Sequence, residues 1–190
     1  MGRAQAAAVA PLLAAARPAV VLSSDLARAR DTAAPLADAA GVVLRVDVRL
    51  RELDLGAWQG LTVEQARERF PDQHAAWRAG VDVPRGGGET YQQAGQRAVA
   101  CLAEALTGLG PAGVLVAVTH GGTARGALCV LLGVQAPQWW RFAALGNTCW
   151  SVLAEHPQGW RLERHGVGPE AVTDPASWPT APPEGEPVRY

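Results

Sequence analysis

The chain has 190 residues, 48% of them hydrophobic, and a formal net charge of −1; this is typical of one compact globular domain. Its 17 basic residues are all arginine, which excludes a P-loop lysine, a Schiff base and a lysine general base. The near-neutral charge gives no reason to expect nucleic acid as a partner, because phosphate-backbone binding usually needs a basic excess.

The N-terminal segment is apolar and Ala-rich, and it predicts a helix over residues 3–16. The run contains Gln5 and Pro11 and is much shorter than the ~20 residues of a membrane span. Only Arg3 precedes it and a strand-like segment follows it directly, which argues against a signal peptide. We therefore expect a cytoplasmic protein that is not bound to a membrane.

Helical and strand patterns then alternate along the chain. Thr90 and Gln93 are spaced as a capping box at the start of a helical run, and residues 114–118 form the continuous apolar run of a parallel strand covered on both faces. The alternation predicts an α/β fold, a three-layer α/β/α sandwich with a mostly parallel sheet. The other predicted elements are a strand at 19–24, a helix at 26–40, a strand at 42–48, two short helices around Pro71 within 62–79, and the capped helix at 90–106.

The C-terminal part follows a different pattern. Two strand-like segments flank "HPQG" within residues 148–164, as in a hairpin, and residues 160–164 alternate apolar and polar side chains like an edge strand. Six of the 14 prolines fall in residues 166–190, which predicts an extended or disordered tail. We therefore expect one domain over residues 1–165, followed by this tail.

The first predicted strand-to-helix turn carries groups that suit an anion. Ser23, Ser24 and Asp25 are N-cap residue types at the strand end. Arg28 follows in the first helical turn, where its guanidinium can contact a phosphate at the helix N-terminus. From these residues alone, a capped helix with a solvent-facing arginine is the more common interpretation of such a segment.

A second such turn is "THGG", in which a buried strand leads into His120 and the glycines Gly121 and Gly122. The glycines let backbone approach a ligand closely, and His120 lies at the strand tip. A histidine that only caps the next helix remains an alternative. A dinucleotide site is disfavoured, because "GGTARG" lacks the GxGxxG spacing and no acidic residue follows until Glu155.

Between these turns, Glu52 follows a strand-like segment and lies among apolar residues such as Leu50 and Leu53. This surrounding predicts a partly buried carboxyl with a raised pKa, the state that a general acid needs. The alternative is a surface glutamate paired with Arg49 or Arg51.

Taken together, several segments resemble the histidine phosphatase superfamily, which has the phosphoglycerate mutase-like fold. The resemblance covers about residues 2–164 and rests on "GRAQAAAVAPLLA", "SSDLARARDTA", "LRELDLGAWQG", "GGGET" and "VTHGG" in this order. The third segment and the short "GGGET" loop resemble the phosphatase branch rather than the mutases, which have a longer insertion there. Within that branch, the chain is most similar to glucosyl-3-phosphoglycerate phosphatases.

The resemblance implies a phosphomonoesterase for a small phosphorylated metabolite, a sugar phosphate or a phosphoglycerate derivative, that acts through a phosphohistidine without a metal or other cofactor. Arg28 and Gly121 correspond to phosphate-binding positions, and Glu52 to the acid that protonates the leaving oxygen and later activates water. His120 corresponds to a second, positively charged histidine that stabilises the transferring phosphoryl group. A phosphoglycerate mutase is the alternative activity in the same fold.

The chain departs from the family pattern at its start. The family's nucleophile lies in an Arg-His-Gly that ends a first strand, whereas Met1 here stands directly before the first helix. We therefore expect a fold that lacks this central strand, little activity from the 190 residues, and a true start codon upstream. A missing strand also predicts exposed apolar surface and self-association, at its simplest a homodimer.

Two further interpretations stay open at this point. One is a complete but catalytically silent protein that keeps Arg28, Glu52 and His120 as an anion pocket. The other is a nucleotide-binding α/β enzyme that uses "THGGTARG". The chain does contain Arg164-His165-Gly166, but the segment "WRLERHG" alternates with charges, unlike a buried central strand. We therefore interpret this tripeptide as a coincidence.

The segment over residues 70–92 is the candidate substrate-recognition region, because loops over the pocket give specificity in this fold. It offers four candidate side chains that the sequence does not rank: Arg78, Arg85, Glu89 and Tyr91.

Overall fold

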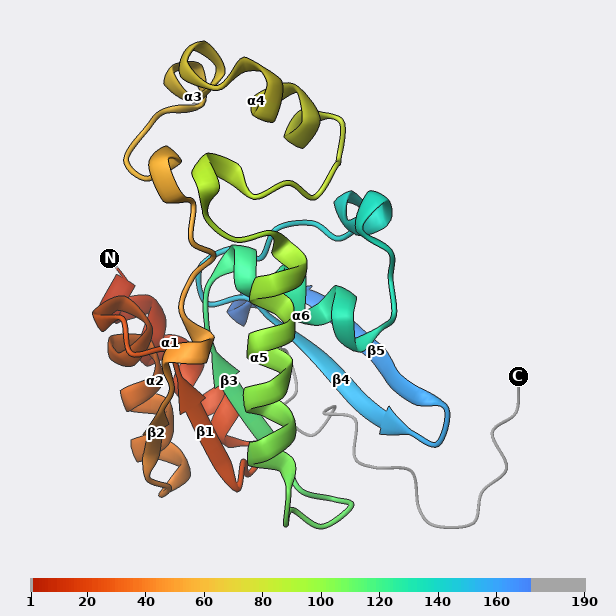
Figure 1. The fold of residues 1–190 in the computed structure, drawn as a ribbon. Coiled ribbons are helices and arrows are strands. Elements are labelled where there is room, and N and C mark those ends of the chain that lie inside the picture. The colour runs from red at the N-terminus through yellow and green to blue at the C-terminus, as the bar shows by residue number, and fades with distance from the viewer. Residues whose placement is uncertain (1, 172–190) are drawn as a thin grey trace.

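The computed structural model describes residues 2–171, so nearly all of the predicted tail, residues 172–190, lies outside the described residues (Figure 1). The predicted order of helices and strands is confirmed, including the break between two short helices at Pro71 and the capping box of Thr90 with Gln93. No helix in residues 2–171 is long and apolar enough to cross a membrane. The helices are α1 (Gly2–Ala14), α2 (Ala27–Ala40), α3 (Val63–Arg69), α4 (Pro71–Arg78), α5 (Tyr91–Leu106) and α6 (Gly121–Leu131); the strands are β1 (Val20–Ser23), β2 (Leu44–Val46), β3 (Leu115–Val118), β4 (Trp150–His156) and β5 (Gly159–Val167).

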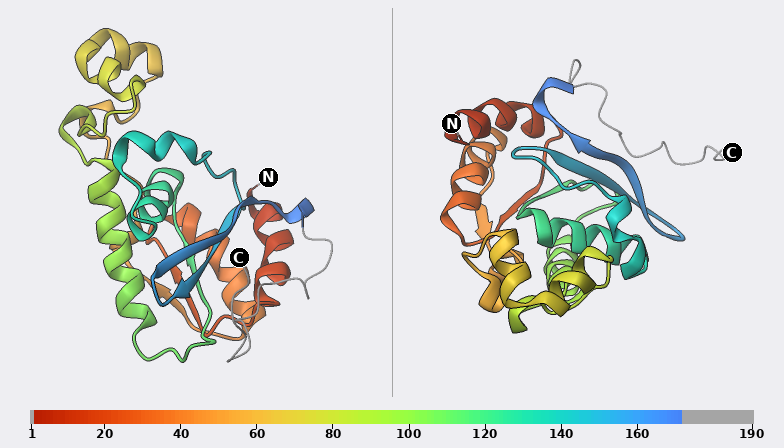
Figure 2. Two further views of the ribbon diagram at one scale, coloured as in Figure 1. Left: turned by 90° about the vertical axis from the view of Figure 1, so that its right-hand side faces the viewer. Right: turned by 90° about the horizontal axis from the view of Figure 1, so that it is seen from above.

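The central sheet has the strand order β2-β1-β3, and both neighbours of β1 run parallel to it. Figure 2 shows α1 and α2 on one face of this sheet and α5 and α6 on the other. Side chains of β1 alternate between the two cores: Val21 packs with α1 and α2, whereas Val20 and Leu22 pack with α5 and α6. The predicted three-layer α/β/α sandwich is therefore confirmed.

Strand β3 is less buried than the sequence predicts. All four residues of β1 are buried, but all four residues of β3 are only partly buried. The reason is its position: β3 ends the strand order, so its outer edge has no hydrogen-bonded neighbour among the described residues. An apolar run alone does not distinguish a central strand from one at an edge.

The predicted hairpin is also confirmed, and β4 and β5 form a separate antiparallel sheet. Strand β5 continues to Val167, past the expected domain limit at residue 165, and a short 3-10 turn at Pro169–Ala171 follows it. Within the described residues β4 has no second neighbour. Among the described residues, β2 and β3 are therefore the edge strands of the first sheet, and β4 and β5 those of the second.

Helices α5 and α6 pack in close contact through two glycines. A Cβ on Gly126 would collide with the carbonyl oxygen of Tyr91, and a Cβ on Gly95 would collide with the backbone of Gly126. No larger residue fits at this crossing, since the atoms in the way belong to the backbone. The contact fixes the N-terminal turn of α6 relative to the start of α5.

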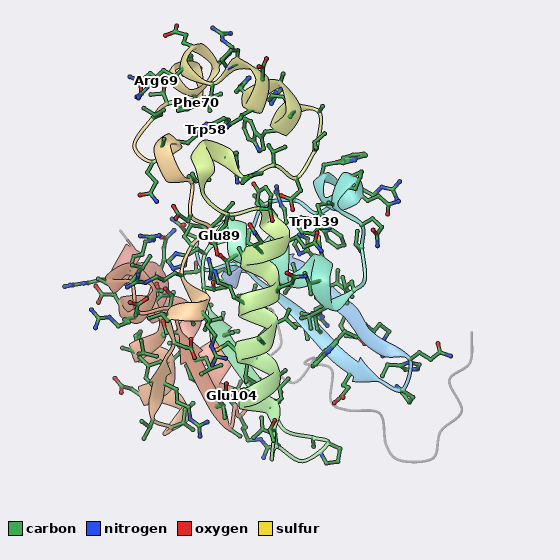
Figure 3. The ribbon with its side chains drawn as sticks, in the orientation of Figure 1. Trp58, Arg69, Phe70, Glu89, Glu104 and Trp139 are labelled. Atoms are coloured by element: carbon green, nitrogen blue, oxygen red, sulfur yellow. The ribbon has the colours of Figure 1, made fainter. Side chains whose placement is uncertain are left out.

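A second region, residues 56–87, stands above the sandwich and is called the cap below; it holds α3, α4 and the 3-10 turns Gly56–Trp58 and Arg85–Gly87 (Figure 1). Its centre is Trp58, which is only 7% exposed. The Trp58 ring centroid lies 6.2 Å from that of Phe70, 6.3 Å from His74 and 6.0 Å from Trp77. Figure 3 shows Trp58 and Phe70 inside the cap and Glu89 where the cap joins the sandwich.

Candidate functional site

The two strand-to-helix turns meet at one edge of the sheet. β1 and β3 are parallel and in register, with Ser23 opposite Val118. The turns that follow them therefore lie side by side, at the edge where open α/β sheets bind ligands. The structure brings Arg28, Glu52 and His120 together there, as the following contacts show.

Arg28 and His120 are joined directly. The Nε of Arg28 donates to Nδ1 of His120 over 3.2 Å, so the imidazole proton lies on Nε2 in the neutral ring. His120 is 8% exposed, and its Nε2 is buried without a hydrogen-bond partner in the described residues. The pair thus presents an unused N–H beside an exposed guanidinium.

The charge state of His120 differs from the positive charge that the family resemblance implies. Burial, followed by the positive charge of Arg28, lowers the pKa of His120 below its usual 6.5, and the negative charge of Glu52 only partly opposes this. The ring is therefore neutral near pH 7 when no anion is bound. A phosphate placed beside it would shift the pKa of His120 back upwards.

Glu52 accepts hydrogen bonds from the N-terminus of α6. Its Oε1 accepts from the backbone N–H of Leu53 at 2.8 Å and of Thr123 at 3.0 Å, and its Oε2 accepts from Gly122 at 3.3 Å. The first N–H groups of a helix have no partner within the helix, so the oxygens of Glu52 can accept from them. The carboxyl group is thereby fixed about one helical turn or less from His120, which occupies the N-cap position.

The alternative in which Glu52 pairs with a neighbouring arginine is wrong. Arg49 binds Asp47, at 2.7 Å, and Arg51 binds Asp25, at 2.6 Å. The side chain of His120 likewise makes no capping hydrogen bond, although it stands at the N-cap position.

The two glycines after His120 have different roles. A Cβ on Gly122 would lie 2.7 Å from Oε1 of Glu52, so a larger residue here would push the carboxylate away from its present position. At Gly121, which is exposed, a Cβ would meet nothing within 4 Å. Gly121 therefore borders open space, as a phosphate-binding position requires.

The loop that carries Glu52 is held by a residue that the sequence did not single out. Arg97 of α5 donates through Nη1 to the carbonyl oxygens of Arg49 and Arg51, at 2.6 and 2.8 Å, and through Nη2 to that of Glu52 at 3.2 Å. Its remaining donors bind both carboxylate oxygens of Glu89 at 2.8 Å. Arg97 is thus a positioning residue for Glu52, and Glu89, a predicted substrate contact, is committed to Arg97.

The expected helix cap after β1 is absent. The N-cap residue of α2 is Leu26, which has no capping side chain. The Oγ of Ser24 accepts from the Leu26 N–H at 3.3 Å, and Asp25 is bound to Arg51. Because the polar side chains are used elsewhere, Arg28 is the group of this turn that faces the site.

Arg164-His165-Gly166 lies in β5, and its histidine is fully bound. Nδ1 of His165 is 2.8 Å from the hydroxyl of Ser151, and Nε2 is 3.0 Å from the carbonyl oxygen of Ala143. The ring also stands edge-on to Phe142. Both nitrogens hold the hairpin against the preceding loop, so neither is available for attack on phosphorus.

The remaining predicted substrate contacts differ in their exposure to solvent. Arg78 is exposed on α4. Arg85 is buried, with its guanidinium carbon 4.7 Å from the ring centroid of Tyr91. In residues 2–171 no group of three or more His, Cys, Asp or Glu side chains is placed to hold a metal ion.

Comparisons with known proteins give consistent matches. The family model of the histidine phosphatase superfamily (branch 1) matches residues 1–168. The glucosyl-3-phosphoglycerate phosphatase of Mycolicibacterium vanbaalenii is 34% identical, with 92% of this chain matched to 85% of that protein. The same-named protein of Mycobacterium tuberculosis is 36% identical over 82% of this chain and 73% of its own length. The solved structure of a mycobacterial glucosyl-3-phosphoglycerate phosphatase in complex with VO3 has a TM-score of 0.80 at 36% identity, and the match covers 88% of this chain and 86% of that one.

Proposed function

The chain belongs to the histidine phosphatase superfamily, and we propose that it is a phosphomonoesterase that works without a metal, through a phosphohistidine intermediate. The observation that carries the proposal is the junction of Arg28, His120 and Glu52 at the carboxyl end of parallel strands. The named relatives support a phosphatase rather than a mutase.

In the proposed reaction, the free guanidinium N–H groups of Arg28 and the Nε2–H of His120 bind the oxygens of the phosphoryl group. Phosphoryl transfer needs such donors, since its barrier falls mainly through positioning and electrostatic stabilisation. The open backbone N–H of Gly121, at the start of α6, adds a further donor. As the nucleophilic histidine forms its bond to phosphorus, the ester P–O bond breaks, and Glu52 in its protonated form gives its proton to the leaving oxygen. Glu52 then takes a proton from the water that attacks the phosphohistidine, which restores the protonated carboxyl group and the free histidine.

The nucleophile has to come from elsewhere. Of the four histidines, His120 already binds Arg28 and His165 is bound through both nitrogens. His74 lies in the ring cluster of the cap and His156 at the hairpin turn. We propose that the nucleophilic histidine lies in an Arg-His-Gly on a strand encoded upstream of Met1, which pairs with the open edges of β3 and β4.

The test compares two forms of the protein with p-nitrophenyl phosphate as substrate. The 190-residue chain is expected to show little or no turnover. A form extended by the in-frame codons upstream of Met1 is expected to be active, and to lose activity when Arg28 or His120 is replaced by Gln. Arg30→Gln is the matched control, because Arg30 is an exposed arginine on the same helix. His120-dependent turnover by the 190 residues would refute the proposal.

A catalytically silent anion-binding protein is the second candidate, and it is favoured by the positions of the other histidines: His165 is bound through both nitrogens, and His74 and His156 lie outside the two turns that carry Arg28 and His120. Stop codons directly upstream of Met1, together with phosphate binding that depends on Arg28, would establish this candidate instead.

The relatives also suggest the substrate class. Since two of them are named for glucosyl-3-phosphoglycerate, we propose a phosphorylated glycerate derivative. A panel of sugar phosphates and phosphoglycerates tested on the extended form would rank these substrates by kcat/KM.

A further inference from the structure

We propose that Arg85 and Arg125, which share the ring of Tyr91, form a subsite for a carboxylate of the substrate, next to the phosphate bound by Arg28 and His120. The proposal rests on the proposed function and deepens it, because it selects phosphomonoesters that carry a second, carboxylate anion.

Arg85 is a buried cation that forms no salt bridge within residues 2–171. It is 6% exposed, and its guanidinium carbon lies 4.7 Å from the Tyr91 ring centroid and 5.7 Å from that of Trp77. No carboxylate among the described residues forms a salt bridge with it. Contacts with ring faces attract a cation, but they leave its N–H donors without acceptors.

Arg125 approaches the same ring from α6. Its guanidinium carbon lies 6.0 Å from the Tyr91 centroid. Its Nε is buried without a hydrogen-bond partner in the described residues. A buried donor left unpaired costs about 1–3 kcal/mol, so an acceptor placed here would recover that loss.

The carboxylates nearest in sequence to Tyr91, those of Asp82 and Glu89, bind groups other than Arg85 and Arg125. Asp82 accepts from the backbone N–H groups of Tyr91 and Gln92, at 2.8 and 2.9 Å. Glu89 is bound to Arg97. Both guanidinium groups lie near the Tyr91 ring, and neither forms a salt bridge with a carboxylate of the described residues. A carboxylate that reaches the unpaired donors of Arg85 and Arg125 would be bound by charge-assisted hydrogen bonds.

The subsite and the phosphate site share one helix. Arg125 lies one turn of α6, about 6 Å along its axis, beyond Gly121. Tyr91 opens α5 and is fixed against α6 by the close contact of its carbonyl oxygen with Gly126. This spacing suits a small molecule whose phosphate and carboxylate are separated by a few bonds, such as a phosphorylated glycerate.

The experiment measures binding of two matched probes to the 190-residue chain by calorimetry. 3-Phosphoglycerate and glycerol 3-phosphate share the phosphate ester, but only the first carries a carboxylate. The wild-type chain is expected to bind 3-phosphoglycerate about tenfold more tightly. In Arg125→Gln this ratio falls to near one, while the affinity for glycerol 3-phosphate is kept. Arg67→Gln, at an exposed arginine of α3 in the cap, keeps the wild-type ratio and controls for general charge.

Arg85 also connects the cap to Tyr91, so its variant needs a check of folding. Arg85→Lys keeps a cation but loses the planar fork, and a reduced ratio with an unchanged unfolding midpoint supports the subsite. A wild-type ratio near one, or a ratio unchanged in Arg125→Gln, overturns the subsite and leaves the proposed function intact. If neither probe binds the wild-type chain, the subsite is overturned, while the proposed function is judged by turnover of the extended form. If Arg28→Gln abolishes binding of both probes, the phosphate site is supported.

Discussion

The sandwich and the cap are stabilised in different ways. In the sandwich, small side chains let helices approach the sheet and each other closely, and its buried core is rich in alanine: Ala6, Ala10, Ala29, Ala33, Ala37, Ala94 and Ala98. In the cap only Trp58, Ala66 and Arg85 are buried, and rings supply most of the contacts. The cap therefore has little hydrophobic core of its own. We expect it to unfold locally at a lower free energy than the sandwich.

The largest effect is expected in the sandwich, from Gly126→Ala. The new methyl group would collide with the backbone of α5, which cannot move without separating the two helices. We expect a loss of about 3 kcal/mol in the free energy of unfolding, measured by urea denaturation. Gly110→Ala, where a Cβ meets nothing within 4 Å, is the control, and equal stability of both variants would contradict the close contact.

In the cap, Trp58→Ala removes the ring that contacts Phe70, His74 and Trp77. We expect the opening free energy of the cap to fall by about 2 kcal/mol. Hydrogen exchange should become faster in α3 and α4, while the amides of α5 and α6 keep their protection. Faster exchange throughout the chain would show that the two regions unfold as one unit.

At the site, Gly122→Ala and Gly121→Ala form a matched pair. The first places a methyl group against the Glu52 carboxylate and the second points into open space. We expect Gly122→Ala to lose about 1 kcal/mol and to shift the amide resonances of Leu53 and Thr123 in NMR spectra. Gly121→Ala should leave these resonances and the stability nearly unchanged. Equal shifts in the two variants would contradict the contact with Glu52.

The smallest effect concerns pH. The folded-state pKa of His120 lies below its unfolded value of 6.5, so the unfolded chain binds a proton first as pH falls. The contribution of His120 to stability is therefore complete above pH 6.5 and is lost as pH falls through the folded pKa. His120→Gln should flatten the dependence of unfolding free energy on pH between about pH 7 and pH 5. An unchanged slope would show that His120 is not the group responsible.

The sequence predicts the sandwich better than the cap because its signals are local. Hydrophobic periodicity and the pairing of Thr90 with Gln93 depend on neighbours in the chain, and the helices they predict are present. The burial of β3 depends on which strands lie beside it, and the hydrophobic pattern of the strand does not indicate its neighbours in the sheet. The ring cluster around Trp58 likewise joins residues from separate turns and helices.

The residues of the site also differ in how well the sequence predicts them. Arg28, Glu52 and His120 stand at predictable strand ends, so their convergence follows from the parallel sheet. The partners of Glu52 were not predictable, because its contacts with Gly122 and Thr123 cross about seventy positions. Nothing in the sequence identified Arg97 as a positioning residue of the site, because its hydrogen bonds go to backbone carbonyl groups, which every residue has.

The separation of the two sheets also bears on the order of folding. Strands β4 and β5 join across a tight turn at residues 157–158, whereas β1 pairs with β3 across residues 24–114. Local pairs form in microseconds, and pairs that close long loops form late, because the loop entropy is lost before the contacts are gained. The hairpin should therefore fold early and on its own. The edge that carries Arg28 and His120 should form last, when most of the chain is already in place.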